Sequence, residues 1–168
     1  PEIRTQIKKV KIFLNIKKLS LDVKIYEPNL LVEDKSIKFE NIKTNISIIS
    51  YFKKEFSIQN LEAATKLNEI KDLIKFLRSI NQTVELFIID KVVKKGKFYS
   101  TIKLKFNEKG KIDNNFIIDG KIIDAEIKFL NKEKIKKINL DFSISNNNYN
   151  LEKVNFNYKK IKLNSKKI

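Results

Sequence analysis

The chain of 168 residues contains no cysteine and no histidine, and these two absences exclude several chemistries together. Without Cys there is no disulfide, thiol nucleophile or thiolate metal site, and without His there is no His-based triad or His metal site. The three glycines, Gly96, Gly110 and Gly120, lie too far apart to form a phosphate-binding loop. The sequence therefore predicts a protein that is not an enzyme and that binds no metal and no other cofactor.

One catalytic alternative is a pair of carboxylates, for example Asp119 with Asp124. Both residues lie beside irregularities in a predicted strand, where Asp is common because it favours turns. This position gives them a structural explanation, and we assign the pair no catalytic role.

Methionine is also absent, the chain begins at Pro1, and no run approaches the ~18 apolar residues of a membrane span. No signal peptide pattern is present either. We therefore expect an internal fragment of a larger protein, with any start methionine and targeting segment outside it.

Arginine is scarce, although the formal net charge is +16. Lys, Ile and Asn dominate the composition, and A+T-rich codons encode all three, so codon bias explains part of the charge. Such a basic chain is attracted to anionic lipid headgroups or to nucleic acid. Nucleic acid is disfavoured, because Tyr99 is the one aromatic residue of the clear strands that lies among lysines, and Arg is the preferred reader of phosphate and guanine.

Strict alternation of apolar and polar residues runs through most of the chain and predicts β-strands. Clear examples are "KVKIFLNI", "LSLDVKI", "FYSTIKLKF" and "IKKINLDFSIS", and "TNISIIS" adds Ile46 and Ile48 in phase. Pro28 ends or kinks the second of these strands. Short connections at "NEKGK", with a left-handed Gly110, at "LNKEKIK" and at "SNNNYN" indicate an antiparallel meander.

One segment follows a helical period instead. In "KLNEIKDLIKFLRSIN", apolar residues recur from Leu67 to Leu77 at the spacing of one helix face. This predicts one short amphipathic helix near residues 66–80, capped by Thr65 or Asn68. The helix separates an N-terminal strand set (about 7–62) from a C-terminal meander (about 84–163) within a single β-rich segment, 1–168.

The predicted fold is mainly β: an antiparallel sheet with that one helix. About nine strands offer roughly 30 inward side chains, whereas the helix offers five or six. One helix cannot cover such a sheet. Either the sheet folds over itself as a filled sandwich or barrel, or its apolar side stays partly open.

The stretch "FIIDGKIIDAEIKFL" (116–130) changes register along its length. Ile118 and Ile122 share one side, whereas Ile127 and Phe129 have the opposite parity, so a bulge at Asp124 and Ala125 would restore a common apolar side. Gly120 would ease the curvature upstream. With "LSLDVKIYEPNLLV" and "FENIKTNISIISYFKKEFSIQNLEAAT", this stretch resembles the AsmA-like superfamily, in particular the TamB- and YhdP-type envelope proteins, from about residue 19 to 158.

This resemblance implies a long curved antiparallel sheet, forming an open groove or half-barrel lined by apolar side chains. The parent protein would be anchored to the bacterial inner membrane and extend through the periplasm. Such proteins are thought to conduct phospholipids towards the outer membrane and so to support outer-membrane biogenesis. The implied partners are phospholipid acyl chains, flanking β segments of the same parent chain, and bacterial membranes contacted through regions outside this chain.

The candidate groove-lining residues alternate along the later strands; they are Phe98, Ile102, Leu104, Phe106, Phe116, Ile118, Ile122, Ile127, Phe129, Ile138, Leu140, Phe142 and Ile144. A dry core would show the same alternation. Two alternatives to the lipid-conducting groove therefore stay open: a filled β-sandwich that serves as a scaffold or interaction module of the cell envelope, and a basic nucleic-acid-binding domain.

Overall fold

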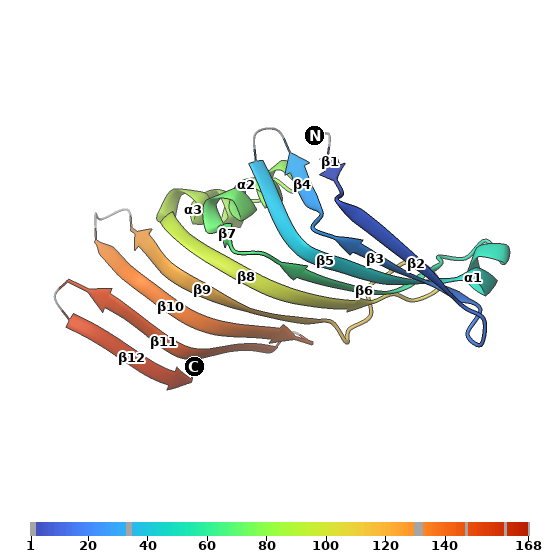
Figure 1. Ribbon diagram of the computed structural model, residues 1–168. Coiled ribbons are helices and arrows are strands. Elements are labelled where there is room, and N and C mark those ends of the chain that lie inside the picture. Colours follow the sequence, from blue (N-terminus) through green and yellow to red (C-terminus); the bar gives the residue numbers. More distant parts are fainter. Residues whose placement is uncertain (1–2, 33–34, 130–132, 147, 160, 168) are drawn as a thin grey trace.

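A single curved sheet makes up most of the molecule (Figure 1). The computed structural model describes residues 3–32, 35–129, 133–146, 148–159 and 161–167. Within these residues the protein is mainly β, with a 12-stranded antiparallel sheet that does not close on itself and three helices. The predicted fold class, a long curved antiparallel sheet that is open, is confirmed.

The strands fall into two groups along the chain. The first group precedes the main helix and consists of β1 (Ile3–Gln6), β2 (Lys9–Asn15), β3 (Ser20–Tyr26), β4 (Asn29–Val32), β5 (Lys35–Ser47), β6 (Ile58–Thr65) and β7 (Asn68–Glu69). The second group follows the helices and consists of β8 (Val93–Lys105), β9 (Ile117–Lys128), β10 (Lys134–Ser145), β11 (Asn148–Tyr158) and β12 (Ile161–Lys167).

The two groups form one continuous sheet. Its main path runs β1-β4-β5-β6-β8-β9-β10-β11-β12, with β2 beside β3, β3 beside the second half of β5, and β7 beside β8. Because β6 pairs directly with β8, with Leu61 opposite Leu104, the sheet continues past the helices that separate the two groups in sequence.

The main helix, α2 (Ile70–Ile80), lies within the range predicted for it. The two residues predicted to cap it, Thr65 and Asn68, form hydrogen bonds with strands of the sheet instead. The Thr65 hydroxyl accepts a hydrogen bond from the Ser100 N–H at 2.8 Å, and the Asn68 side chain accepts from the Lys38 N–H at 2.8 Å. Glu69 precedes the helix without a side-chain capping bond.

Two further helices were not predicted. Ile48, expected in phase on a strand, begins α1 (Ile48–Phe52), because the Ser47 side chain caps the chain there by accepting from the Ser50 N–H. The start of the predicted C-terminal meander forms α3 (Val84–Val92), and the Thr83 hydroxyl caps it by accepting from the Leu86 N–H. Local capping outweighed strand alternation at both places.

One of the predicted turns lies wholly within the described residues, and the turn predicted at "SNNNYN" falls partly on residue 147, which lies outside them. Gly110 has a φ of +75° and its N–H donates to the Asn107 carbonyl at 2.9 Å, in the loop between β8 and β9. Asn146 has a φ of +47° between β10 and β11. The connection predicted at "LNKEKIK" falls partly on residues 130–132, which lie outside the described residues.

Three neighbouring strands each carry a bulge. Asp124, Lys137 and Lys153 have φ values of +47°, +53° and +50°, and the pairings of β9, β10 and β11 shift register beside them. A bulge bends its strand and increases the local twist. Because the three bulges lie in adjacent strands, these strands bend together.

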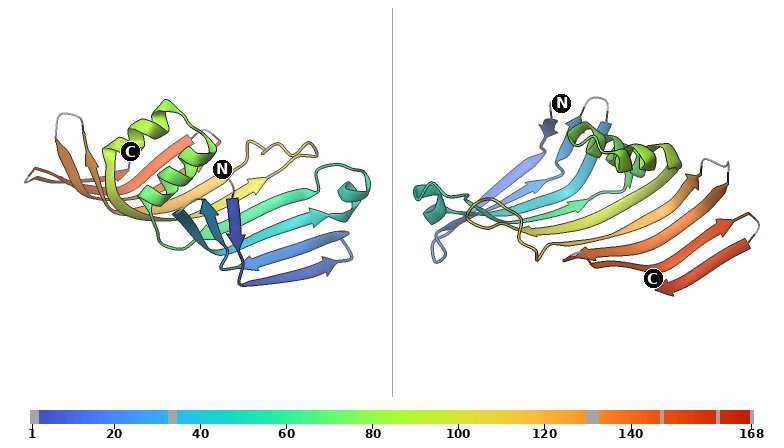
Figure 2. Two further views of the ribbon diagram at one scale, coloured as in Figure 1. Left: turned by 90° about the horizontal axis from the view of Figure 1, so that it is seen from above. Right: turned by 180° about the vertical axis from the view of Figure 1, so that it is seen from behind.

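A second bend affects the earlier strands. Glu27, with a φ of +48°, and the buried Pro28 separate β3 from β4, and the pairing of β5 with β6 shifts register between Phe39 and Asn41. Pro28 therefore ends a strand, as its missing N–H predicts. The strands curve toward the side on which α2 and α3 lie (Figure 2).

The core is thin and lies under α2. Ile37, Phe39 and Ala63 form its buried cluster, and Leu73 and Phe76 of α2 pack against them. Only nine hydrophobic side chains among the described residues are buried. This number is small for a chain that is 42% hydrophobic, so most of the apolar surface of the sheet is left without a second layer.

Candidate functional site

One row of apolar side chains crosses eight strands of the sheet. In an antiparallel sheet, residues directly opposite each other project from the same face. The row follows such opposite pairs from β2 to β11 and consists of Val10, Ile25, Ile42, Ala63, Ile102, Ile118, Ile144 and Tyr149. We call it the central row and the face that carries it the apolar face.

Parallel rows flank the central row on the apolar face. Toward α1, a row of opposite residues runs Ile12, Val23, Thr44, Leu61 and Leu104. Toward α2, a second row runs Thr65, Ser100, Gly120, Phe142 and Leu151. The hydroxyl of the buried Thr65 accepts the backbone N–H of Ser100, so this side chain places no unsatisfied group in the lining.

The second of these rows requires a residue without a side chain at Gly120. A Cβ atom on Gly120 would lie 2.5 Å from Cζ of Phe142 and 2.6 Å from the carbonyl oxygen of Tyr99. Glycine therefore lets the Phe142 ring lie flat across β9 on the apolar face. The sequence suggested a role for Gly120 in curvature, and the contacts assign it to this close approach of an aromatic ring.

The bulge at Asp124 keeps the later part of β9 on the same face. Ala125 lies opposite Ile138, and Ile127 lies opposite Ile135. A Cβ atom on Gly96 would lie 2.7 Å from Cβ of Ala125 and 2.8 Å from Cδ1 of Ile70 in α2. Because α2 covers the apolar face at this point, Ala125 and its neighbours in register belong to that face.

Most of the sequence-predicted lining residues come together on the apolar face. Phe98, Ile122 and Leu140 are opposite one another in β8, β9 and β10, and the same registers place Ile102, Leu104, Ile118, Ile127, Ile138, Phe142 and Ile144 beside them. Three others lie outside the named strands. Phe106 contacts Phe56 with ring centroids 5.4 Å apart, Phe116 precedes β9, and Phe129 follows it and is largely exposed.

Helix α2 divides the apolar face into a covered part and an open part. Near α2, Phe98, Ala125 and Ile138 are buried. Away from it, Ile102, Leu104, Ile118, Ile122, Leu140, Phe142 and Ile144 are only half-buried. The open part therefore presents aliphatic and aromatic side chains that shield one another sideways but have no second layer above them.

Residues that sequence reasoning missed extend this surface in both directions. Val10, Ile12, Val23, Ile25 and Ile42 continue the lining across β2, β3 and β5. Leu151, Phe156 and Leu163 continue it across β11 and β12. Their alternation was visible in the sequence, but only the register of the paired strands shows that all of them share one face.

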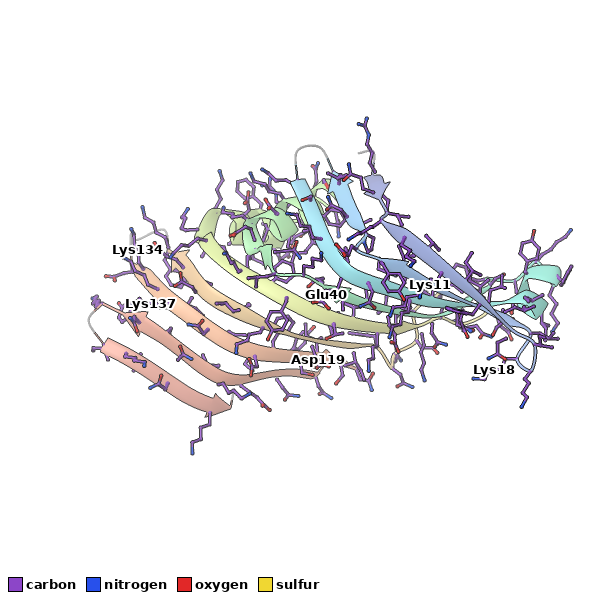
Figure 3. All side chains as sticks on the ribbon, in the orientation of Figure 1. Lys11, Lys18, Glu40, Asp119, Lys134 and Lys137 are labelled. Carbon is purple, nitrogen blue, oxygen red and sulfur yellow. The ribbon has the colours of Figure 1, made fainter. Side chains whose placement is uncertain are left out.

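The opposite face of the sheet is polar and basic. One row of opposite residues runs Lys11, Lys24, Lys43, Glu62 and Lys103. Lys11 and Lys24 both lie over the Tyr26 ring, 5.6 and 4.6 Å from its centroid. Lys11 is labelled in Figure 3, and so is Asp119, which lies on the same polar face opposite Thr101.

The carboxylates of the polar face are held by lysines. Asp124 pairs with Lys95 at 2.9 Å, and Asp141 pairs with Lys153 at 2.7 Å. The hydrogen bond from Lys153 is the main cause that lowers the pKa of Asp141. These contacts give both carboxylates a structural role, and no group of residues in the described part of the chain is arranged to hold a metal ion.

Helix α3 is held to α2 by one acidic side chain. Asp90 accepts hydrogen bonds from Lys71 and Arg78, both of α2. Burial alone would raise the pKa of Asp90, but the hydrogen bonds and charges of Lys71 and Arg78 outweigh it and hold the pKa below its usual value. The helix pair that flanks the open part is thus fixed by an ionic contact.

Comparison with protein families, with curated proteins and with solved structures finds no match for this chain. No helix in the described ranges is long and apolar enough to cross a bilayer. The likeness to the AsmA-like superfamily stays a prediction.

Proposed function

We propose that the open part of the apolar face binds the acyl chains of phospholipids, and that the chain is a lipid-conducting segment of the bacterial cell envelope. The central row carries this proposal. It crosses eight strands, and its residues Ile102, Ile118 and Ile144 have no second layer over them. Monomeric proteins rarely expose contiguous apolar surface on this scale unless it binds something.

The dimensions of the row suit an acyl chain. Eight strands at a spacing of about 4.8 Å give a row about 34 Å long. One leaflet of a bilayer has about 15 Å of hydrocarbon, half of the total core thickness of about 30 Å. Ala63, in the middle of the row, is buried in the core cluster under α2, so the open stretch runs from Ile102 to Tyr149, across four strands and about 14 Å. This open stretch matches the length of one acyl chain.

Burial of methylene groups supplies the affinity, at about 0.8 kcal/mol for each one removed from water. Ile, Val and Leu recur along the rows, so neighbouring positions offer similar contacts and none forms a deep local minimum. A bound chain can slide along such a lining. The headgroup stays in water on the open side, and the net charge of +16 attracts anionic lipids to the protein.

Two observations favour this proposal over the alternatives. A filled sandwich needs a second layer, and among the described residues α2 and α3 supply cover only at one end of the sheet. A single-strand nucleic-acid platform needs aromatic side chains among the lysines. Tyr26 of β3 and Tyr99 of β8 do lie on the polar face, but β5 and β6 separate them, so they form no continuous row for stacked bases. Phe98 and Phe142 lie on the apolar face, away from the lysine row.

The test uses two substitutions on one strand with opposite orientations. Leu104→Arg places a charge on the open part of the apolar face, and Thr101→Arg places the same charge on the polar face of β8. Phospholipid that copurifies with each protein is counted by native mass spectrometry, and circular dichroism checks the fold. We expect Leu104→Arg to lose most of its lipid and Thr101→Arg to keep it.

A well-folded wild-type protein that carries no lipid, and that takes up none from added phospholipid, would contradict the proposal. If Leu104→Arg fails to fold, Ile144→Ser provides a milder change in the central row. Its matched control is Ser143→Ala on the polar side of the same strand. Equal lipid content in both folded variants of this pair would also argue for a sealed core.

A further inference from the structure

The end of the sheet beside α1 carries the two most exposed large apolar side chains of the described residues, Phe52 and Ile16. The connection between β2 and β3 contains Ile16 and Leu19, which are 74% and 47% exposed. In α1, Ile49, Tyr51 and Phe52 are 47%, 70% and 78% exposed. The Ile48 N–H donates to the Leu19 carbonyl at 2.9 Å, so the two segments form one unit. We call residues 16–19 and 48–54 the α1 tip.

The α1 tip is also basic. It contains Lys17, Lys18, Lys53 and Lys54 and no acidic residue. No ion pair joins these four lysines to a carboxylate in the part of the chain that the structure describes. The tip therefore combines four lysines with five exposed apolar side chains.

The apolar side chains of the tip contribute nothing to the core of the protein. No residue of α1 is buried, and the Tyr51 and Phe52 rings contact each other edge to face with centroids 6.0 Å apart. Water-exposed aromatic rings at a protruding position carry a hydration cost that the fold does not relieve. This arrangement points to a partner that covers them.

The shape and charge of the tip select the class of partner. Figure 1 shows α1 and the β2–β3 connection at one extreme end of the molecule, and Figure 3 shows Lys18 at that end. A second copy of the chain has the same positive tip and a net charge of +16, so charge repulsion opposes contact between two tips. A protruding apolar point with a lysine rim matches the boundary between headgroups and acyl chains in an anionic membrane.

We infer that the α1 tip docks the protein on an anionic bilayer, with Tyr51, Phe52 and Ile16 inserted at the headgroup–acyl boundary and the four lysines against the lipid phosphates. This inference does not depend on lipid binding by the apolar face. Docking through the tip would, however, bring one end of the apolar face near the bilayer, because the row formed by Leu14, Leu21 and Ile46 lies next to the tip.

A hollow of about 550 Å³ lies at the same end of the sheet. Phe56, Ile58 and Phe106 are among its lining residues, and Ser50 of α1 borders it. Gln59, Asn107, Glu108 and Lys109 also line this hollow, so docking through the tip would bring a recess with both apolar and polar walls close to the bilayer.

The test is cosedimentation of the purified protein with two kinds of vesicle: phosphatidylcholine alone, and equal parts of phosphatidylcholine and phosphatidylglycerol. The wild type should bind the anionic vesicles more tightly. The double variant Tyr51→Ser with Phe52→Ser should lose affinity for both kinds. The double variant Lys17→Glu with Lys18→Glu should lose at least about tenfold on the anionic vesicles, since each lysine near an anionic surface strengthens binding about fivefold.

The chain offers matched controls for both variants. Tyr99 is 44% exposed and lies on the polar face of β8, away from the tip. Tyr99→Ser should leave vesicle binding unchanged. Lys162→Glu with Lys166→Glu on β12 makes the same change in charge as the tip variant and should cost clearly less affinity. All of the substituted side chains are exposed, so folding should be retained.

Three results would overturn the inference: tip variants that bind like the wild type, controls that lose as much as tip variants, or tip variants that lose binding to a single-stranded oligonucleotide while keeping vesicle binding. Failure here is separable from failure of the proposed function. Leu104→Arg should lose copurified lipid and still bind vesicles, whereas the tip variants should keep their copurified lipid and lose the vesicles.

Discussion

The side-chain amide of Asn139 donates to Oδ1 of Asn155 at 3.3 Å, across the boundary between β10 and β11. Each of these asparagines also donates to the carbonyl of the bulged lysine two residues earlier, at 2.9 Å for Lys137 and 3.2 Å for Lys153. Oδ1 of Asn139 accepts the N–H of the bulged Asp124 at 3.1 Å. One chain of hydrogen bonds thus connects the three bulges that bend the sheet.

Replacement of Asn139 by Ala should destabilise the protein by about 1–3 kcal/mol, because it removes the group that connects all three bulges and leaves the Asp124 N–H without that acceptor. Urea denaturation measures the effect. Asn150→Ala is the control, since Asn150 is an exposed residue of β11 outside this chain of bonds, and it should change stability by less than about 0.5 kcal/mol. Equal effects would show that the asparagine chain does not stabilise the bend.

The sequence predicted the bulge at Asp124 because the apolar residues change parity there. The same change of parity occurs at the other two bulges but was not used: from Ile135 to Ile138 across Lys137, and from Leu151 to Val154 across Lys153. The two bulges also share the pattern of Lys, a β-branched apolar residue and Asn, and the apolar residue is buried in both. Only the structure explains why that pattern matters.

Strand periodicity identified the antiparallel sheet and most of the lining residues of the later strands, because alternation is a local property of the chain. It left undecided whether the sheet closes on itself. It did not find α1 or α3. In α3, apolar residues occupy all sides, and Val84, Phe87 and Ile88 stay exposed. Such a segment has neither a strand period nor a helical stripe, so its capping by Thr83 decides its structure.

Gly120→Ala should destabilise the protein by about 1–3 kcal/mol, the usual cost of overpacking. The new Cβ would meet the backbone carbonyl of Tyr99, which cannot move away easily, as well as the Phe142 ring. Adding Phe142→Leu should recover part of the loss, and thermal denaturation of the two variants measures it. A Gly120→Ala protein as stable as the wild type would mean that the ring does not lie over Gly120 in solution.

Asp90→Asn should loosen α3 from α2, because it removes the carboxylate that accepts from Lys71 and Arg78. The lysine and arginine side chains are about one-third exposed and can return to water, so the loss should be modest, about 1 kcal/mol. Hydrogen exchange of the α3 amides should quicken in the variant. Unchanged exchange would show that apolar contacts alone hold the helix.

The effect of Asp90 should also depend on pH. Its pKa is lowered in the folded protein, so its contribution to stability is complete above the ordinary carboxyl pKa of 3.8 and is lost as the pH falls through the lowered value. The wild type and Asp90→Asn should therefore differ in urea stability at neutral pH and become alike in strong acid. A difference that grows as the pH falls would have the wrong sign for this contact.

The salt dependence of binding should distinguish the lipid-binding proposal from the nucleic-acid alternative. Acyl chains on the apolar face gain their free energy from hydrophobic burial, which salt does not screen, so uptake of a fluorescent phospholipid delivered in detergent should not weaken from low to high salt. Phosphate binding by the lysine row of the polar face would weaken steeply, because each neutralised phosphate releases counterions. Lys24→Glu with Lys43→Glu should accordingly leave phospholipid uptake unchanged, since both lysines project from the polar face opposite each other. A steep loss of phospholipid uptake with salt, or its loss in this double variant, would mean that the polar face rather than the apolar face holds the lipid.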